Sequence, residues 1–292
     1  MKGAARKSLK VLCWAAGVVL LLTVCAVVYL FVSNTRVSCS SYQMLSKKVP
    51  YDFNGYKIGV ISDFHNGGNY GKVLKQMKKQ SPDIIAVVGD TINSQEAAFE
   101  NAQQLISGLV QIAPTYVISG NHERWADEAV TKAFFKYVED AGAVCLDDKA
   151  VTLKKRDAVI NLVGAQDEAY SDDLINRYDD VVNKHLNQLD KKIADKDLFT
   201  VYLFHRGNLA EKPAAYDYDL ILSGHLHGGI VNLPVIRDRI LKSHGDDVKY
   251  YKGEYTVENS KVIISGGLES RPDEIRILNP PEIVIVTLKS KL

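Results

Sequence analysis

The stretch "IGVISDFH" (residues 58–65) places a short apolar run directly before Asp63 and His65. A nearly continuous apolar run of this length is typical of a β-strand covered on both faces, as in the sheets of α/β proteins. The same design, an apolar run that ends in polar side chains, returns four times: "IIAVVGD" (84–90), "YVISGNHE" (116–123), "VYLFH" (201–205) and "LILSGHLH" (220–227). Helix-like segments separate the first three runs. We therefore predict one α/β domain in which helices cover a central sheet or pair of sheets.

The side chains at the ends of these runs are of the types that bind metal ions. They comprise five histidines, two aspartates and one asparagine: Asp63, His65, Asp90, Asn121, His122, His205, His225 and His227. Because ligands bind beyond the carboxyl ends of strands in open α/β sheets, we expect these groups to converge although they lie far apart in the sequence. Imidazole with carboxylate suits zinc, manganese or iron, whereas calcium and magnesium favour oxygen ligands alone.

The local spacing supports a common site. In Asp-x-His and His-x-His, two side chains separated by one residue point to the same side of an extended backbone. Gly89, Gly120 and Gly224 permit sharp turns and close approach of the backbone. Taken singly, each motif also fits an ordinary turn or a helix cap. Their joint occurrence favours a metal site.

The N-terminal region predicts a membrane anchor. Residues 11–32 form a run of 22 residues without charge, which is long enough to span a bilayer as a helix. Four basic residues precede the run and three follow it soon after, which favours a cytoplasmic N-terminus and an extracytoplasmic domain. The opposite orientation is the alternative. A cleaved signal peptide is the competing interpretation, but "YLFVSNTR" (29–36) offers no convincing small-residue cleavage site.

We divide the chain into a cytoplasmic N-terminus with the anchor (1–33), a linker without clear periodicity (34–55) and one domain (56–292). Within the domain, helices are expected at 72–80, 96–110, 125–141 and 172–196, and further strands at 143–165, 198–205, 218–225, 261–267 and 282–288. The segment 228–256 reads as a long connection, and long connections are often functional.

The charge balance and the cysteines argue against other classes of protein. The 36 basic and 35 acidic residues give a net charge of +1, which lacks the basic excess of a nucleic-acid-binding protein. Four cysteines, two of them in the apolar run, form no disulfide framework or zinc knuckle. His185 and His244 lie outside the motifs and are expected at the surface.

In their order along the chain, Asp-x-His, Gly-Asp, Gly-Asn-His-Glu, an isolated His and Gly-His-x-His resemble the signature of the calcineurin-like metallophosphoesterases, over roughly 57–288. The apolar N-terminal run and the ending "IRILNPPEIVIVTLK" (275–289) look like the membrane-anchored bacterial subgroup. That subgroup includes phosphodiesterases and enzymes similar to UDP-2,3-diacylglucosamine hydrolases. The resemblance implies a central β-sandwich flanked by helices, in four αββα layers, preceded here by a transmembrane helix.

The resemblance also implies a centre of two transition metal ions, manganese, iron or zinc. One ion would be held by Asp63, His65, His227 and a bridging Asp90, and the other by Asp90, Asn121, His205 and His225. His122 matches the family's histidine that approaches the leaving-group oxygen, and Glu123 would support the site or begin a helix. Asn93 stands where purple acid phosphatases have tyrosine, so iron-tyrosinate ligation is not expected. Arg206 is either a bidentate donor to a substrate phosphate or a solvated surface residue.

These expectations lead to a membrane-anchored, metal-dependent phosphohydrolase. We expect a phosphodiesterase or pyrophosphohydrolase in which a hydroxide bridging the two ions attacks a phosphate ester, lipid-linked or from the cell envelope. Alternatives are a phosphomonoesterase, a nuclease, or a binding or scaffold module of the same fold that has lost catalysis. All ligand positions are filled, which disfavours the scaffold, and no aromatic stacking run favours the nuclease. The sequence does not indicate an oligomeric state.

Overall fold

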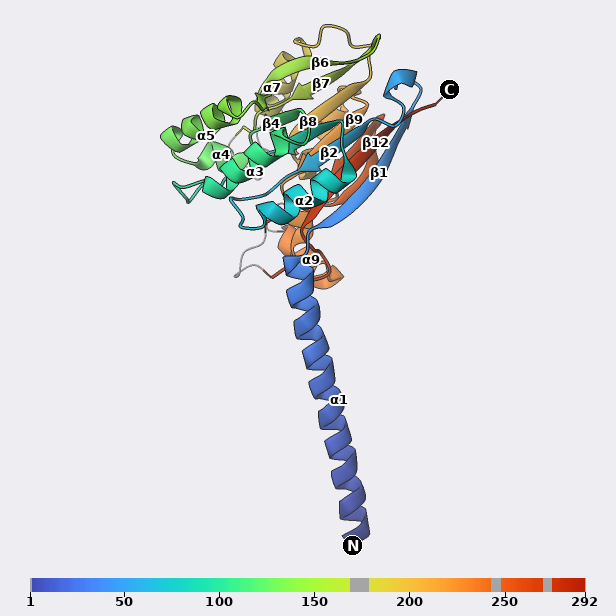
Figure 1. Cartoon of the computed structure of the whole chain (residues 1–292). Helices are drawn as coiled ribbons and strands as arrows, with labels where there is room; N and C mark the ends of the chain where they lie inside the picture. The colour runs from blue at the N-terminus through green and yellow to red at the C-terminus, as the bar shows by residue number, and fades with distance from the viewer. Residues whose placement is uncertain (1, 169–178, 243–247, 270–274, 292) are drawn as a thin grey trace.

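Two six-stranded sheets form the centre of the computed structural model, which describes residues 2–168, 179–242, 248–269 and 275–291 (Figure 1). The first sheet has the order β1 (Ser38–Ser46), β12 (Glu282–Ser290), β2 (Lys57–Ile61), β3 (Ile84–Val88), β4 (Thr115–Ile118) and β5 (Val144–Cys145). The second has the order β10 (Gly253–Val257), β11 (Ser260–Ile264), β9 (Leu220–Gly224), β8 (Thr200–Arg206), β7 (Ala158–Gly164) and β6 (Lys149–Lys155). Strands β2 to β5 are parallel, and so are β7, β8, β9 and β11.

Alternate residues of the apolar runs face different cores. Val88 belongs to the core between the two sheets, whereas Val87 packs under the helices that cover the first sheet. Those helices are α2 (Tyr70–Gln80), α3 (Glu100–Val110) and α5 (Glu128–Asp140). On the second sheet, the outer core contains residues of α7 (Asp179–Asp190) and α8 (Glu211–Ala214). Because the strands are apolar on both faces, the chain builds the four αββα layers that the sequence predicts.

Helix α1 (Lys2–Thr35) projects from the domain (Figure 1). Its segment Leu12–Thr35 has 24 residues, a mean hydropathy of 2.7 and no burial inside the protein. It is long and apolar enough to cross a membrane.

The linker prediction is wrong for residues 38–46, which form β1. This edge strand pairs in parallel with β12, with Ser38 opposite Glu282. Only Met44 of the strand is buried, because the strand lies at the edge and carries mostly polar residues. It therefore shows neither the apolar run of a central strand nor a clear alternation.

Two further segments differ from the sequence prediction. The long connection 228–256 contains the short helix α9 (Pro234–Leu241), with proline in its first turn, and β10. The helix expected at 125–141 begins only at Glu128, as α5, because Asp127 caps it by accepting a hydrogen bond from the Ala129 N–H, and a separate short helix, α4 (Asn121–Trp125), precedes it. Gly142, with φ of 93°, ends α5 as predicted.

His185 is not a surface residue. Its side chain is 12% exposed and its two ring nitrogens contact Asp148 and Glu168. Burial alone would lower the pKa of His185, but the two carboxylates outweigh burial and raise it to about 9. His244, also expected at the surface, and the first part of the helix expected at 172–196 lie outside the described residues.

The ion pairs of His185 with Asp148 and Glu168 predict that the stability of the protein depends on pH. Since the folded pKa lies above the unfolded value of about 6.5, the stabilisation is complete below pH 6.5 and disappears as the pH rises through 9. We expect the wild type to lose roughly 1–2 kcal/mol relative to His185→Gln between pH 6 and pH 10 after allowance for solvent screening. Thermal unfolding of both proteins in detergent at the two pH values measures the difference. A parallel pH dependence in the two would contradict this role.

Candidate metal centre

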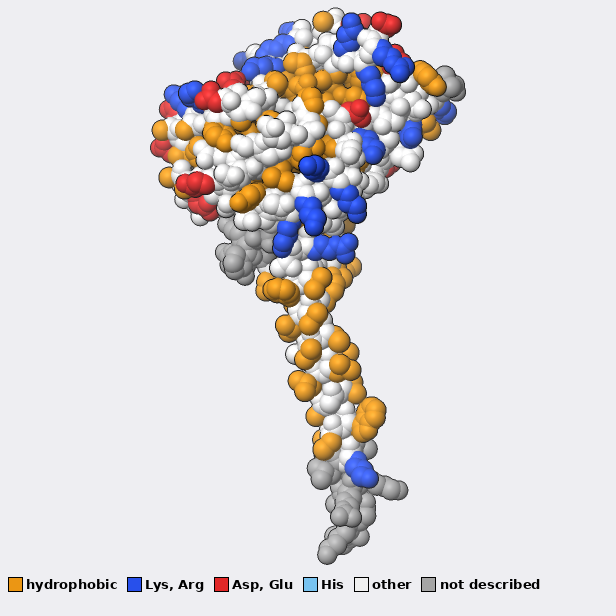
Figure 2. All heavy atoms as spheres, in the orientation of Figure 1, with side chains coloured by type: hydrophobic (Ala, Val, Ile, Leu, Met, Phe, Trp, Pro, Cys, Tyr) orange, Lys and Arg blue, Asp and Glu red, His pale blue; other side chains and the backbone are white. Residues whose placement is uncertain are grey.

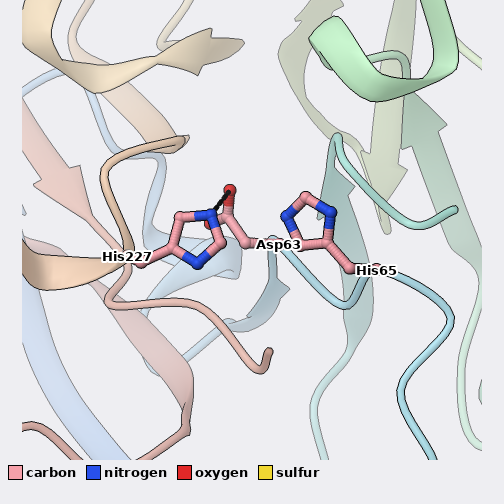
Figure 3. Close-up of side chains that lie close together, drawn as sticks. All are labelled: Asp63, His65 and His227. Atoms are coloured by element: carbon pink, nitrogen blue, oxygen red, sulfur yellow. Dashed lines mark ion pairs between the residues drawn. The ribbon is translucent and has the colours of Figure 1, made fainter. Parts of the chain in front are cut away.

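The five motifs meet at the carboxyl ends of strands from both sheets, with His205 still within β8 (Thr200–Arg206) and the others after their strands. Strands β2, β3 and β4 of the first sheet and β8 and β9 of the second lead into them. Three groups have ligand atoms within 4.8 Å of one another: Asp63, His65 and His227; His65, Asp90 and His122; and Asp90, His205 and His225. Figure 3 shows His65 and His227 on either side of Asp63, although His227 follows a strand of the other sheet. The predicted convergence is therefore present.

Asp90 lies between two sets of candidate ligands, which we call the two halves of the site. One half contains His65 and the other contains His205. Its Oδ2 atom is 3.2 Å from His205 Nε2 and 3.7 Å from His65 Nε2, while Oδ1 accepts a hydrogen bond from the His122 N–H at 2.8 Å. One carboxylate oxygen thus faces imidazoles from both halves. This is the position that a bridging ligand requires.

The ring of His205 is held in one orientation. Its Nδ1 atom contacts the Val88 carbonyl oxygen at 2.8 Å, as an N–H donor would. With Nδ1 held in this way, Nε2 faces the centre, where Asn121 Oδ1 lies 3.1 Å and Asp90 Oδ2 3.2 Å away. Burial lowers the pKa of His205, but the charge of Asp90 outweighs burial and raises it to about 10, so a metal ion that binds Nε2 would displace a proton. A backbone carbonyl that fixes the tautomer in this way is common behind metal-binding histidines.

The backbone at these residues is not extended, contrary to the geometry assumed from the sequence. Positive φ angles occur at Asp63 (50°), His65 (47°), Asp90 (53°), His225 (86°) and His227 (49°). The side chains converge through tight left-handed turns after the strands and not through strand pleating. Backbone strain of this kind persists where the surrounding structure enforces it, and it is frequent at functional sites.

All three predicted glycines are required by close approach, and a Cβ atom on Gly224 would lie 2.5 Å from Asp63 Oδ2. A Cβ atom on Gly120 would lie 2.3 Å from Asp90 Oδ1, and one on Gly89 would lie 2.6 Å from His205 Nδ1. All three distances are far below van der Waals contact. Any larger residue would displace the ligand groups.

Glu123 supports the loop that carries Asp90. Its buried carboxylate accepts hydrogen bonds from four backbone N–H groups, those of Asp90, Thr91, Ile92 and Gly120. Burial and the charge of Asp90 raise the pKa of Glu123 to about 7, while these donors favour the charged form. The supporting role predicted for Glu123 agrees with these contacts.

Replacing Glu123 with glutamine is expected to lower the stability by about 3 kcal/mol, because the amide N–H₂ would face backbone donors that now share a carboxylate. For a domain of this size the loss corresponds to a fall of about 6–12 °C in Tm. Glu128→Gln is the matched control, since the side chain of Glu128 is 81% exposed. Equal melting temperatures for the two variants would exclude the support.

Arg206 is buried, so the alternative of a solvated surface arginine is wrong. It is 2% exposed, and its guanidinium pairs with both oxygens of Asp167, at 2.7 and 3.1 Å. Its Nη1 atom also lies 3.4 Å from His225 Nε2. In this structure Arg206 connects Asp167 with the candidate ligand His225. Contact with a substrate phosphate stays a prediction.

The sequence reasoning missed Glu269. Its Oε2 atom is 2.8 Å from His227 Nδ1 and 3.9 Å from His65 Nε2. The sequence does contain a pattern that indicates it. Glu269 follows the apolar strand β11 and the pair Gly266–Gly267, so a polar residue comes after an apolar strand here as in the five motifs. A carboxylate on the second nitrogen of a histidine orients the ring and makes it a stronger ligand.

The residues present fit metal ions. Neither ring nitrogen of His65 has a hydrogen-bond partner among the described residues, although the side chain is 1% exposed. Burial lowers the pKa of His65 to about 4, so the ring is neutral at pH 7, the form that binds metal. Asp63 and Asp90 are also buried, and carboxylates in such a place require positive charge nearby.

Comparison with known proteins agrees with this geometry. The profile of the family described as calcineurin-like phosphoesterase matches residues 56–229. The chain belongs to this family. The two sheets and their flanking helices agree with the fold expected from the motifs, and candidate ligand residues lie on both sides of Asp90.

Three relatives place this calcineurin-like protein within the family. It is 27% identical over 264 residues to the uncharacterized metallophosphoesterase YkuE of Bacillus subtilis, covering 87% of this chain and 86% of that protein. It is 25% identical over 242 residues to the transmembrane protein with metallophosphoesterase domain of Bos taurus, covering 78% of this chain and 52% of that protein. It is 23% identical over 212 residues to the phosphodiesterase YaeI of Escherichia coli, covering 72% of each chain.

Proposed function

We propose that the protein is a phosphohydrolase with two transition metal ions, manganese, iron or zinc, that cleaves phosphodiesters or pyrophosphates. The observation that carries the proposal is the position of Asp90 Oδ2, which faces His205 of one ligand group and His65 of the other. A shared carboxylate is what a pair of ions needs and what a single ion does not.

The residues around Asp90 divide into two sets. Asp63, His65 and His227 would hold one ion with Asp90, and Asn121, His205 and His225 would hold the other. Two such ions would clamp the phosphoryl oxygens and provide hydroxide at neutral pH. Asn121 contributes a neutral oxygen, so the loaded site stays positive towards an anionic substrate. The His122 ring, beside His65 at a centroid distance of 4.3 Å, is the group available to the leaving oxygen.

The membrane assignment forms part of the proposal. The helix α1 would anchor the protein as a single span in the cell membrane, with a cytoplasmic N-terminus and the domain outside. A relative described as a transmembrane protein supports the anchor, and the relative described as a phosphodiesterase supports the preference for diesters. The substrate would be a phosphate ester of the membrane or envelope.

Hydrolysis of bis-p-nitrophenyl phosphate tests the proposal. The purified full chain in detergent is treated with EDTA and then titrated with Mn²⁺, Fe²⁺ or Zn²⁺. We expect no turnover in the stripped protein, recovery with metal, and saturation at two ions per chain. p-Nitrophenyl phosphate serves as the monoester comparison. Absence of turnover with every metal would reject the enzyme in favour of a binding module.

A further inference from the structure

Five exposed apolar side chains lie beside the point where α1 meets the domain. They are Leu233, Val235, Ile236, Ile275 and Leu278, with exposed fractions of 38, 84, 46, 54 and 52%. We call them the α9 patch. The two segments that carry them run side by side, since the Asn232 N–H donates to the Ile277 carbonyl and Val231 pairs with Ile277. Exposed apolar groups that cluster in this way mark an interaction surface.

The α9 patch is tied directly to the end of the apolar helix. Asn34, in the last turn of α1, donates to the Arg276 carbonyl at 2.8 Å and accepts from the Arg276 N–H at 2.7 Å. Arg276 lies between Ile275 and Leu278 in the sequence. The candidate span ends at Thr35, so a bilayer crossed by α1 would have its surface at this junction. The patch then lies at the depth of the lipid headgroups.

The charges around the junction suit a lipid surface. Arg36 and Lys72 are exposed at the end of α1, where Lys72 Nζ donates to the Thr35 carbonyl at 2.7 Å. Arg239 and Lys242 are exposed on and directly after α9. Figure 2 shows Lys and Arg side chains on the domain next to the helix, above the apolar surface of α1. Basic residues that border an apolar surface favour the interface of an anionic membrane.

The same two segments also support the metal centre. The His227 carbonyl accepts a hydrogen bond from Asn279 Nδ2 at 2.6 Å, and Arg276 Nη1 donates to the Gly266 carbonyl at 2.6 Å. Three residues separate His227 from Val231, where the pairing with the patch segment begins. The side of the site formed by His227 therefore lies next to the proposed membrane surface.

We propose that the α9 patch inserts into the headgroup region of the bilayer that α1 spans, and that the site acts on phosphate esters carried by lipids of that bilayer. The partner is the lipid surface itself. The substrate part rests on the proposed phosphohydrolase function, whereas the insertion of the patch does not.

Fluorescence quenching tests the insertion. The full chain carries Val235→Trp in a background where Trp14 and Trp125 are replaced by phenylalanine, and it is reconstituted into phosphatidylglycerol vesicles that contain brominated lipid. Leu45→Trp is the matched control, because Leu45 is 56% exposed and lies on β1, roughly 20 Å of strand beyond Ser38. We expect strong quenching at position 235 and little at position 45. Equal quenching at both positions overturns the insertion, as does a dimer in detergent that buries the introduced indole at position 235 against a second copy.

A pair of substrates tests the consequence for catalysis. Hexadecyl p-nitrophenyl phosphate partitions into vesicles, whereas methyl p-nitrophenyl phosphate stays in water, and both release the same group. We expect the double variant Val235→Asp, Ile236→Asp to lower kcat/KM for the hexadecyl ester by about tenfold or more and to leave the methyl ester unchanged, since only apolar contact with the interface is lost. Leu45→Asp should change neither.

The outcomes separate the two proposals. Equal losses on both esters, or no loss on either, overturn the membrane role of the patch. A wild type that hydrolyses the methyl ester but not the hexadecyl ester overturns the lipid substrate. A wild type that hydrolyses neither ester contradicts the phosphohydrolase function, and the quenching result still decides the insertion.

Discussion

Replacing Asp90 with asparagine is expected to abolish phosphodiester turnover. An amide cannot supply negative charge to two ions, so the variant loses the group that joins the two halves of the site. Loss of a supporting residue behind a metal ligand costs about 10–100-fold. Removal of the shared ligand should therefore lower the rate of turnover by more than about 100-fold. The rate with bis-p-nitrophenyl phosphate and the metal content per chain measure the effect.

The structure explains why asparagine is the informative substitution. Asp90 has φ of 53°, a conformation that asparagine tolerates better than most residues. The amide oxygen can still accept the hydrogen bond that the His122 N–H now gives to Oδ1. We therefore expect little change in Tm. Asp217→Asn is the matched control, because Asp217 has φ of 58° and lies away from the site. A variant that keeps two metals and the full rate would disprove the bridging role.

The sequence was sufficient for the layered core because the strands that build it are apolar on both faces. The run Ile84–Val88 supplies alternate residues to two cores, and such a pattern has few other interpretations. Strand β1 could not be found in this way. Its partner β12 is far away in sequence, and its exposed edge position places little demand on side-chain type.

The candidate site was also predictable in membership but not in geometry. The position of polar residues directly after apolar strands predicted which residues converge, because a polar group at the end of a buried strand lies at the edge of the sheet. The left-handed turns at Asp63 and His225 depend on contacts between distant segments: the His225 N–H donates to Asp63 Oδ1 at 2.9 Å. Pairing of Arg206 with Asp167 likewise joins two distant segments, and nothing in the local sequence of either residue specifies it.

His122 presents the second large expected effect. Its Nδ1 atom accepts a hydrogen bond from the Ser94 N–H at 3.2 Å, which places the ring proton on Nε2. A donor in that position can serve the departing oxygen of the substrate. We expect His122→Asn to lower kcat by about 10²–10⁴-fold, the range for loss of a positioned proton donor. The loss should be larger for an alkyl leaving group than for p-nitrophenolate, which leaves without help.

Metal content distinguishes this role from ligation. His122 lies in one of the three groups with ligand atoms in reach of one another, together with His65 and Asp90. A ligand would take its metal with it when replaced, whereas a proton donor would not. Retention of two ions per chain in His122→Asn, combined with a rate that depends steeply on the leaving group, would assign the donor role. Loss of one ion with no such dependence would make His122 a ligand and would require a different donor for the leaving oxygen.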